Sequence, residues 1–188
     1  MKIDRAEILR YMRMGGADPS GELARRIDRV AAETARAAAP KIFIRREKIA
    51  RRGFSADGKA VLVFGSLALE SNDLARVLGA SDEAYLIIAT LGSGVDRLAR
   101  RLAVTSPLDA LIVQAAGAGL VESFLDEEQA KLGATTMRFS PGYGDLAIEC
   151  QRDFLSFMDS MRTVGVALTD RLLMVPSKSV TAIAGVKK

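Results

Sequence analysis

The residues best suited to bind a ligand lie in one short stretch, 138–145, which reads RFSPGYGD. Its first residue, Arg138, can bind a carboxylate or a phosphate through two parallel hydrogen bonds. Proline at the second turn position and glycine at the third are typical of a type II turn, so the sequence predicts one over 140–143, with a positive φ at Gly142. Such a turn displays backbone N–H and C=O groups, and the missing glycine side chain lets a ligand come close, while Tyr143 adds a ring face and a hydroxyl. The same residues are also compatible with a strand end, a tight turn and a half-buried tyrosine that bind nothing.

The composition excludes several kinds of catalytic site. The chain has 188 residues, no histidine and a single cysteine, Cys150. A Ser-His-Asp or Cys-His apparatus therefore cannot be built within it, and zinc sites of the Cys/His type are excluded as well. One cysteine cannot form a disulfide framework, which favours a reducing cytoplasm, and we expect Cys150 to be a buried structural thiol. No signal peptide is recognised and no apolar run reaches the roughly 20 residues of a spanning helix, so we expect no membrane association.

Positive charge is concentrated between Arg25 and Arg52. The formal net charge is +4; this segment holds ten basic and three acidic residues, or +7, and the remaining 17 basic and 20 acidic residues give −3. Such a patch can attract a nucleic acid, an acidic partner or a phosphorylated ligand. It can equally be the solvated face of a helix followed by an edge strand guarded by charge, and we favour this interpretation. Because only Phe43 and Phe54 could stack on bases, we expect no nucleic-acid partner.

Two other loops carry patterns that superficially suggest anion binding. Gly92-Ser93-Gly94 precedes a helix, whose N-terminus could hold an anion, but the full Gly-x-Gly-x-x-Gly spacing is missing because residue 97 is arginine. We therefore interpret it as a strand-to-helix turn. The Pro176-Ser177-Lys178-Ser179 segment lacks the glycines of a phosphate loop, and we interpret it as a β-turn that joins two strands.

The surrounding segments mix helices and strands without a steady βαβ order. Apolar spacing, breakers and caps, among them Ser71 and Ser93 as N-caps, predict helices over 3–14, 18–39, 71–78, 94–104, 108–131 and 147–161. Apolar runs predict strands over 41–49, 60–64, 84–91, 135–139, 172–175 and 179–186. The last two strands follow one another with no helix between them, which favours antiparallel pairing. The pattern predicts an α+β fold, and we expect one domain over 1–188.

Two motifs resemble the activation domain of vitamin B12-dependent methionine synthase. Arg138, Gly142 and Tyr143 match that family's Arg-x-x-x-Gly-Tyr element, which binds S-adenosylmethionine. A later Leu-Thr-(Asp/Glu)-x-x-x-Met-x-Pro-x-x-Ser-Val element is matched by Leu168, Thr169, Asp170, Met174, Pro176, Ser179 and Val180. The helix around Glu122 is similar to a family helix whose glutamate also contacts the ligand. The resemblance covers roughly 108–185, whereas 1–100 match poorly and offer no equivalent of an aspartate that helps hold the ligand in the family.

The resemblance implies a curved α+β domain with a twisted antiparallel sheet and flanking helices. It implies that S-adenosylmethionine is bound by Arg138, Ser140, Gly142, Tyr143 and Glu122, with no catalytic side chain and no metal ligand. Arg138 suits the carboxylate of the ligand, Glu122 suits its ammonium or overall positive charge, and the backbone around Ser140 can reach its other polar atoms. The implied role is that of a stand-alone reactivation component of a cobalamin-dependent methyltransferase in methionine biosynthesis.

Such a component supports the reductive methylation of inactive cob(II)alamin on a partner. Because the chain has no histidine, it cannot supply imidazole to cobalt, so we expect the cobalamin on a corrinoid-binding protein or methyltransferase subunit, with a flavodoxin-like protein as electron donor. An alternative is a non-catalytic module that docks on a corrinoid protein and caps its cofactor. The poor match of 1–100 motivates this alternative.

Overall fold

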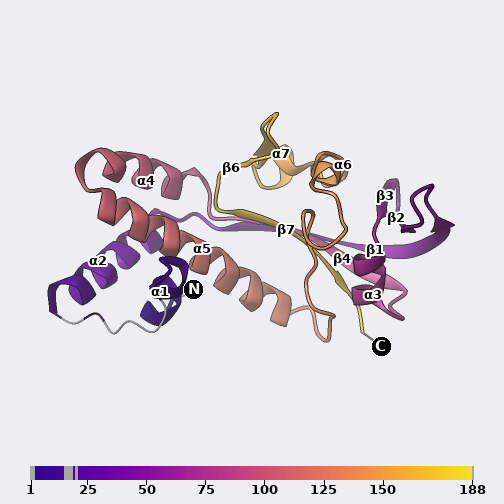
Figure 1. Cartoon of the computed structure of the whole chain (residues 1–188), viewed down its shortest axis with the longest axis horizontal. Helices are drawn as coiled ribbons and strands as arrows, with labels where there is room; N and C mark the ends of the chain where they lie inside the picture. The colour runs from indigo at the N-terminus through magenta and orange to yellow at the C-terminus, as the bar shows by residue number, and fades with distance from the viewer. Residues whose placement is uncertain (1–2, 15–18, 20, 188) are drawn as a thin grey trace. The chain divides into compact units, whose positions relative to one another are not determined.

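The computed structural model of the chain describes residues 3–14, 19 and 21–187, which form an α+β fold (Figure 1). This is the fold class predicted from the sequence. The chain divides into two compact units, each assembled from segments that are distant in the sequence. The first comprises Met1–Lys41, Thr90–Lys131 and Val175–Ser179, and the second comprises Ile42–Ala89, Leu132–Met174 and Val180–Lys188. The single domain over 1–188 stays a prediction.

The first unit is helical. Its helices are α1 (Arg5–Tyr11), α2 (Gly21–Ala37), α4 (Ser93–Thr105) and α5 (Pro107–Ala130). All four were predicted, although the expected helix stop at Gly15-Gly16 and the expected N-terminal residues Asp18 and Ser20 lie outside the described residues. The N-cap of α4 is Gly92, with a φ of 73°, so the assignment of Ser93 as N-cap was wrong. Ser93 is already inside the helix, where its hydroxyl accepts a hydrogen bond from Arg97 Nη1 at 2.6 Å.

The glycines before α4 serve a close approach to the end of α2. A Cβ atom on Gly94 would lie 2.0 Å from the carbonyl oxygen of Ala37, and one on Gly92 would lie 3.1 Å from that of Ala39. The Ala39 N–H donates to the carbonyl of Leu91 at 2.8 Å, which fixes the two segments together. The Gly-Ser-Gly motif is therefore explained by packing, as the strand-to-helix interpretation requires.

Helix α5 forms the core of the first unit. By length and composition it is the one helix among the described residues that could cross a membrane, but 56% of its most apolar window is buried inside the protein. The core helix of a soluble protein passes the same test. A Cβ atom on Gly119 would lie 1.9 Å from Ile3 Cδ1. Because glycine has no side chain, Ile3 can pack directly against α5 at this position.

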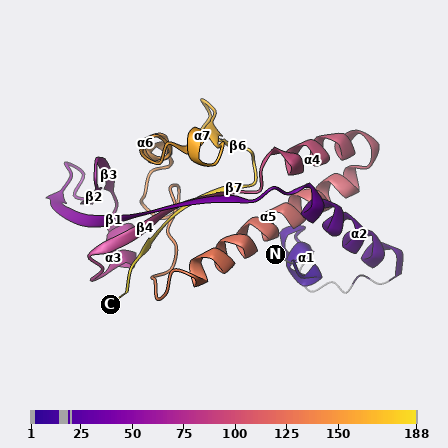
Figure 2. The ribbon, with the colours of Figure 1, turned by 180° about the vertical axis from the view of Figure 1, so that it is seen from behind.

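A five-stranded sheet, most of which belongs to the second unit, has the order β3-β2-β1-β4-β7 (Figure 2). The strands are β1 (Lys41–Phe54), β2 (Ala60–Phe64), β3 (Leu67–Glu70), β4 (Glu83–Thr90) and β7 (Ser179–Gly185). β2 pairs antiparallel with both β1 and β3, and the register of β1 with β2 shifts between Arg51 and Phe54. β3 was not predicted, although the two residues between it and β2, Gly65-Ser66, form a typical hairpin connection.

The core of the second unit lies between the sheet and the remaining helices, α3 (Asn72–Leu78), η1 (Ile148–Cys150), α6 (Gln151–Phe157) and α7 (Ser160–Thr163). Ser71 is the N-cap of α3, as predicted, and its hydroxyl oxygen accepts from the Leu74 N–H at 2.9 Å. The single helix predicted over 147–161 is interrupted at Asp159, which has a left-handed φ of 47°. Fully buried side chains of this core include Phe64, Leu86, Ile88, Phe154 and Ile183.

Two strand predictions need correction. Residues 135–139 form no strand, only isolated bridges from Thr135 to Val186 and from Phe139 to Ile183. Between them the Thr136 hydroxyl accepts from the Gly185 N–H at 2.9 Å, so a side chain takes the place of a backbone acceptor.

The last two strands do not pair with each other. β6 (Met174–Val175) pairs with β5 (Ala167–Leu168), whereas β7 lies beside β4. The physical reason is a tight turn before β6: the Thr169 N–H donates to the Leu173 carbonyl at 2.9 Å, and Leu172 has a φ of 61°. This turn brings β6 back to β5.

Candidate functional site

The predicted type II turn is present over 140–143. Tyr143 N–H donates to the carbonyl oxygen of Ser140 at 3.1 Å, and Gly142 at the third turn position has a φ of 88°. The loop closes further along, because the Gly142 N–H donates to the Leu146 carbonyl at 2.9 Å and the Leu146 N–H donates to the Tyr143 carbonyl at 3.0 Å. Since Leu146 is buried, the turn is fixed at its base to the core of the second unit.

Phe139 is the point where the loop is attached to the sheet. Phe139 exchanges two backbone hydrogen bonds with Ile183 of β7, at 2.9 and 2.7 Å, so the residues before and after it are held against the strand. Arg138 is half-buried, and the Tyr143 side chain is 66% exposed. The ring of Tyr143 is therefore not used in packing, which argues against a loop whose tyrosine has only a structural role.

The far end of the loop is held by Asp145. Its carboxylate accepts hydrogen bonds from the Ser71 hydroxyl, from the Asn72 N–H at 2.9 Å and from the Asp73 N–H at 3.1 Å. Its backbone carbonyl accepts from Lys59 Nζ at 2.8 Å. Asp145 thereby caps α3, because the N–H groups of the first helical turn have no partner within the helix.

The environment of Asp145 favours its ionised form. Burial by itself would raise the pKa of this carboxyl, but the hydrogen bonds from Ser71, Asn72 and Asp73 outweigh burial, and the charge of Lys59 adds to them. The net effect is a pKa below the usual value. The carboxylate of Asp145 is consequently charged at neutral pH.

Four of the five residues proposed to contact the ligand lie in this one loop: Arg138, Ser140, Gly142 and Tyr143. Glu122 is a half-buried residue of α5, which belongs to the first unit. Asp145 was not among the predicted site residues. The only local signal for it was its place directly after the Gly-Tyr-Gly sequence, since its partners in α3 are more than 70 residues away.

Residues of the second motif serve mainly structural roles. In the second unit, the Thr169 hydroxyl accepts from the Leu173 N–H at 3.1 Å, and Met174 packs against the core. In the first unit, the buried Ser179 hydroxyl lies 2.8 Å from Thr90 Oγ1 and 2.7 Å from the Pro176 carbonyl. These contacts form the turns on either side of β6.

Lys178 is a half-buried cation that the sequence interpretation passed over. Its aliphatic chain covers Gly117 of α5, where a Cβ atom would lie 3.1 Å from the lysine Cγ and Cε. Burial lowers the pKa of Lys178, and the charge of Asp96 partly opposes this shift. The neighbouring Ser177 binds Asp96 through its hydroxyl and through its N–H, at 3.0 Å.

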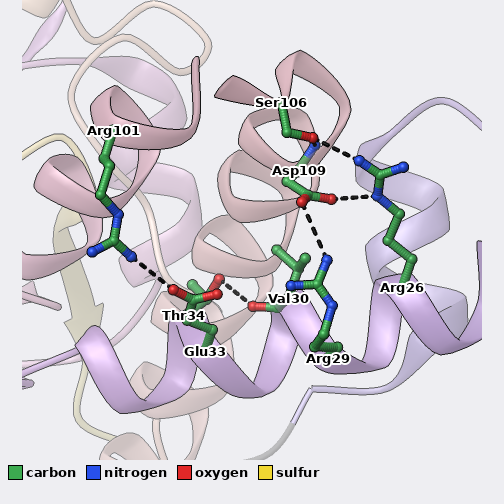
Figure 3. A network of polar contacts seen from close by, with 8 residues as sticks. All are labelled: Arg26, Arg29, Val30, Glu33, Thr34, Arg101, Ser106 and Asp109. Atoms are coloured by element: carbon green, nitrogen blue, oxygen red, sulfur yellow. Dashed lines mark hydrogen bonds and ion pairs between the residues drawn. The ribbon is translucent and has the colours of Figure 1, made fainter. Parts of the chain in front are cut away.

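Local acids neutralise much of the basic segment 25–52. In the first unit, the Asp109 carboxylate accepts from Arg26 Nε at 2.6 Å and from Arg29 Nη2 at 3.2 Å (Figure 3). In the second unit, two further arginines of the basic segment form ion pairs with glutamates, Arg45 with Glu47 and Arg46 with Glu83. These ion pairs are compatible with a solvated surface, and the expected lack of a nucleic-acid partner stays a prediction. Within the described part of the chain, no group of three or more Cys, Asp and Glu residues could hold a metal ion.

Comparison with known proteins places the fold. No family model matches the sequence, and no curated protein matches it. Among solved structures, the chain is similar to the MetH reactivation domain bound to AdoHcy, with a TM-score of 0.64. The two share 15% sequence identity, and the match covers 98% of this chain and 70% of the other. At this identity the likeness shows the fold alone.

Proposed function

We propose that this chain binds S-adenosylmethionine at the 138–145 loop. The observation that carries the proposal is the type II turn that follows the half-buried Arg138 and leaves the Tyr143 side chain 66% exposed. Two further findings support it: the match of this loop to the Arg-x-x-x-Gly-Tyr element, and a fold similar to that of a domain solved with AdoHcy.

The residues of the loop fit the chemistry of such a ligand. The Arg138 guanidinium suits the ligand carboxylate, and Gly142 and Tyr143 are both exposed, so this part of the turn is accessible. The side of Gly142 where a Cβ atom would lie is occupied by Ile148, whose Cδ1 is 3.1 Å from that position. Tyr143 offers its ring to the ligand, and Glu122 is proposed to balance the ligand's positive charge. When bound, S-adenosylmethionine supplies a methyl group that its sulfonium has already activated. The chain's own part is to bind and orient the ligand and to keep water away.

We further propose that the chain is a reactivation component of a cobalamin-dependent methyltransferase of the methionine synthase type, working in the cytoplasm. The cobalamin is carried by a corrinoid-binding partner, because this chain has no histidine to offer to cobalt. A flavodoxin-like protein is proposed as the electron donor. These assignments rest on the motif resemblance.

Calorimetry with S-adenosylhomocysteine tests the binding site. We expect micromolar-range binding by the wild-type chain, and a loss of about one to two decades in Arg138→Ala, because a hydrogen bond to a charged group contributes about 1.5–3 kcal/mol. Arg162→Ala is the matched control, since this arginine lies in the same unit and its side chain is 88% exposed. The proposal fails if the wild-type chain gives no binding, or if Arg138→Ala binds as tightly as the control.

Reconstitution tests the wider role. A corrinoid protein in the cob(II)alamin state, a reductant and methyl-labelled S-adenosylmethionine are mixed with and without this chain. Label on the corrinoid only in the presence of the chain supports a reactivation component. Stable binding to the corrinoid protein without ligand binding or methyl transfer would instead support the capping module.

A further inference from the structure

We propose that Asp145 is a positioning residue for the 140–143 turn, and that it acts through an exchange of carboxylates with Asp73. This inference rests on the proposed function, since it concerns the affinity of the same loop for its ligand. The carboxylate of Asp145 binds backbone N–H groups at the start of α3, and in return Asp73 Oδ2 accepts from the Asp145 N–H at 3.1 Å. We call this reciprocal pair the carboxylate clamp.

The clamp joins three segments of the second unit. The loop contributes Asp145, the start of α3 contributes Ser71 and Asp73, and the connection after β1 contributes Lys59, whose ammonium binds the Asp145 carbonyl. The Lys59 carbonyl in turn accepts from the Ser55 N–H at 2.8 Å. Movement at the end of the loop therefore breaks contacts in two other elements.

The glycine before Asp145 is required by this geometry. Gly144 has a φ of 52°, and a Cβ atom there would lie 2.2 Å from Asp73 Oδ2. A side chain at this position and the Asp73–Asp145 contact cannot coexist without a shift of the loop. In the Gly-Tyr-Gly-Asp sequence, only Gly144 separates the exposed Tyr143 from Asp145 of the clamp.

The clamp holds the outer part of the loop, where packing is limited and includes Ile148, whose Cδ1 lies 3.1 Å from the Cβ position of Gly142. Gly142, Tyr143 and Gly144 are all exposed, and the buried residues of the loop, Pro141 and Leu146, lie on either side of them. A binding loop that is ordered before the ligand arrives avoids the cost of ordering during binding. Loss of the clamp should therefore weaken binding although Asp145 need not touch the ligand.

Amide exchange and calorimetry on the full chain test the clamp. In Asp145→Asn we expect the Gly142 and Tyr143 amides to exchange at least about tenfold faster than in the wild type. We expect the affinity for S-adenosylhomocysteine to fall about tenfold, at a temperature where the variant is fully folded. Asp153→Asn removes an exposed carboxylate of the same unit and should change neither quantity.

A second control separates positioning from stability. Val166→Ala removes core volume elsewhere in the second unit, so it should lower the melting temperature and leave the affinity unchanged. The inference is overturned if Asp145→Asn leaves amide exchange or affinity at the wild-type level. It is also overturned if Val166→Ala loses as much affinity as Asp145→Asn. If the wild-type chain binds no ligand, the proposed function fails, and unchanged amide exchange would separately refute the clamp.

Discussion

Removal of the Asp109 carboxylate should destabilise the first unit more than the loss of an exposed ion pair in that unit does. The Asp109 side chain is 8% exposed and lies between two arginines of α2 (Figure 3). Arg26 reaches the carboxylate through Nε and donates through Nη2 to the Ser106 hydroxyl at 2.6 Å. Ser106 is the N-cap of α5, so the substitution Asp109→Ala disturbs the contact of α2 with the start of α5.

The magnitude follows from what each partner loses. Breaking a fully buried ion pair costs about 3–5 kcal/mol, because the remaining charge is stranded. Here the side chains of Arg26 and Arg29 are 35% and 59% exposed, so both can regain water, and that penalty is small. What remains is the loss of hydrogen bonds to a charged group, about 1.5–3 kcal/mol, and the loss of an acid in the first turn of a helix, about 0.3–1 kcal/mol. We expect Asp109→Ala to lower the free energy of unfolding by about 2–4 kcal/mol.

Urea denaturation at pH 7, followed by far-UV circular dichroism, measures this loss. With a slope of about 2 kcal/mol per molar urea, the midpoint should fall by about 1–2 M. The matched control is Glu33→Ala, which breaks the pair of Glu33 with Arg101, 2.8 Å apart, between α2 and α4. The side chains of that pair are 29% and 68% exposed, so the control should cost at most about 1 kcal/mol. Equal losses in the two variants would refute the reasoning from burial.

Three further outcomes are expected. Burial alone would raise the pKa of Asp109, but Arg26 and Arg29 hold it below its usual value. The contribution of Asp109 to stability is therefore complete above its pKa in the unfolded chain, about 3.9, and is lost as the pH falls through its lower pKa in the folded chain. The urea midpoints of the wild type and of Asp109→Ala should consequently converge in acid. Gly94→Ala should lower the free energy of unfolding by about 2 kcal/mol, measured by thermal denaturation. The new Cβ would collide with the backbone carbonyl oxygen of Ala37, which cannot move aside as a flexible side chain could. Burial, and then the nearby charges of Asp153 and Glu149, raise the pKa of Cys150 to about 11. Iodoacetamide at pH 7.5 should therefore label this thiol at least tenfold more slowly in the folded chain than in urea, as measured by mass spectrometry.

The sequence by itself determined the features that depend on a few neighbouring residues. Pro141 and Gly142 specify the type II turn, because one fixes φ near the value that the second turn position needs and the other tolerates positive φ at the third. Ser71 specifies the start of α3 for a similar reason, since its hydroxyl reaches an N–H group three residues away. The apolar pattern also gave the main helices and the longer strands of an α+β fold.

Only the tertiary structure decided which distant segments become partners. The sequence pattern cannot pair Asp145 with the start of α3, or Asp109 with Arg26, 83 residues away, because a carboxylate satisfies whichever donors the fold brings to it. The same holds for backbone edges: 135–139 and β6 are both strand-like in sequence, yet one forms isolated bridges and the other joins β5. A strand needs a free neighbour in register, and the path of the whole chain decides which edge is available.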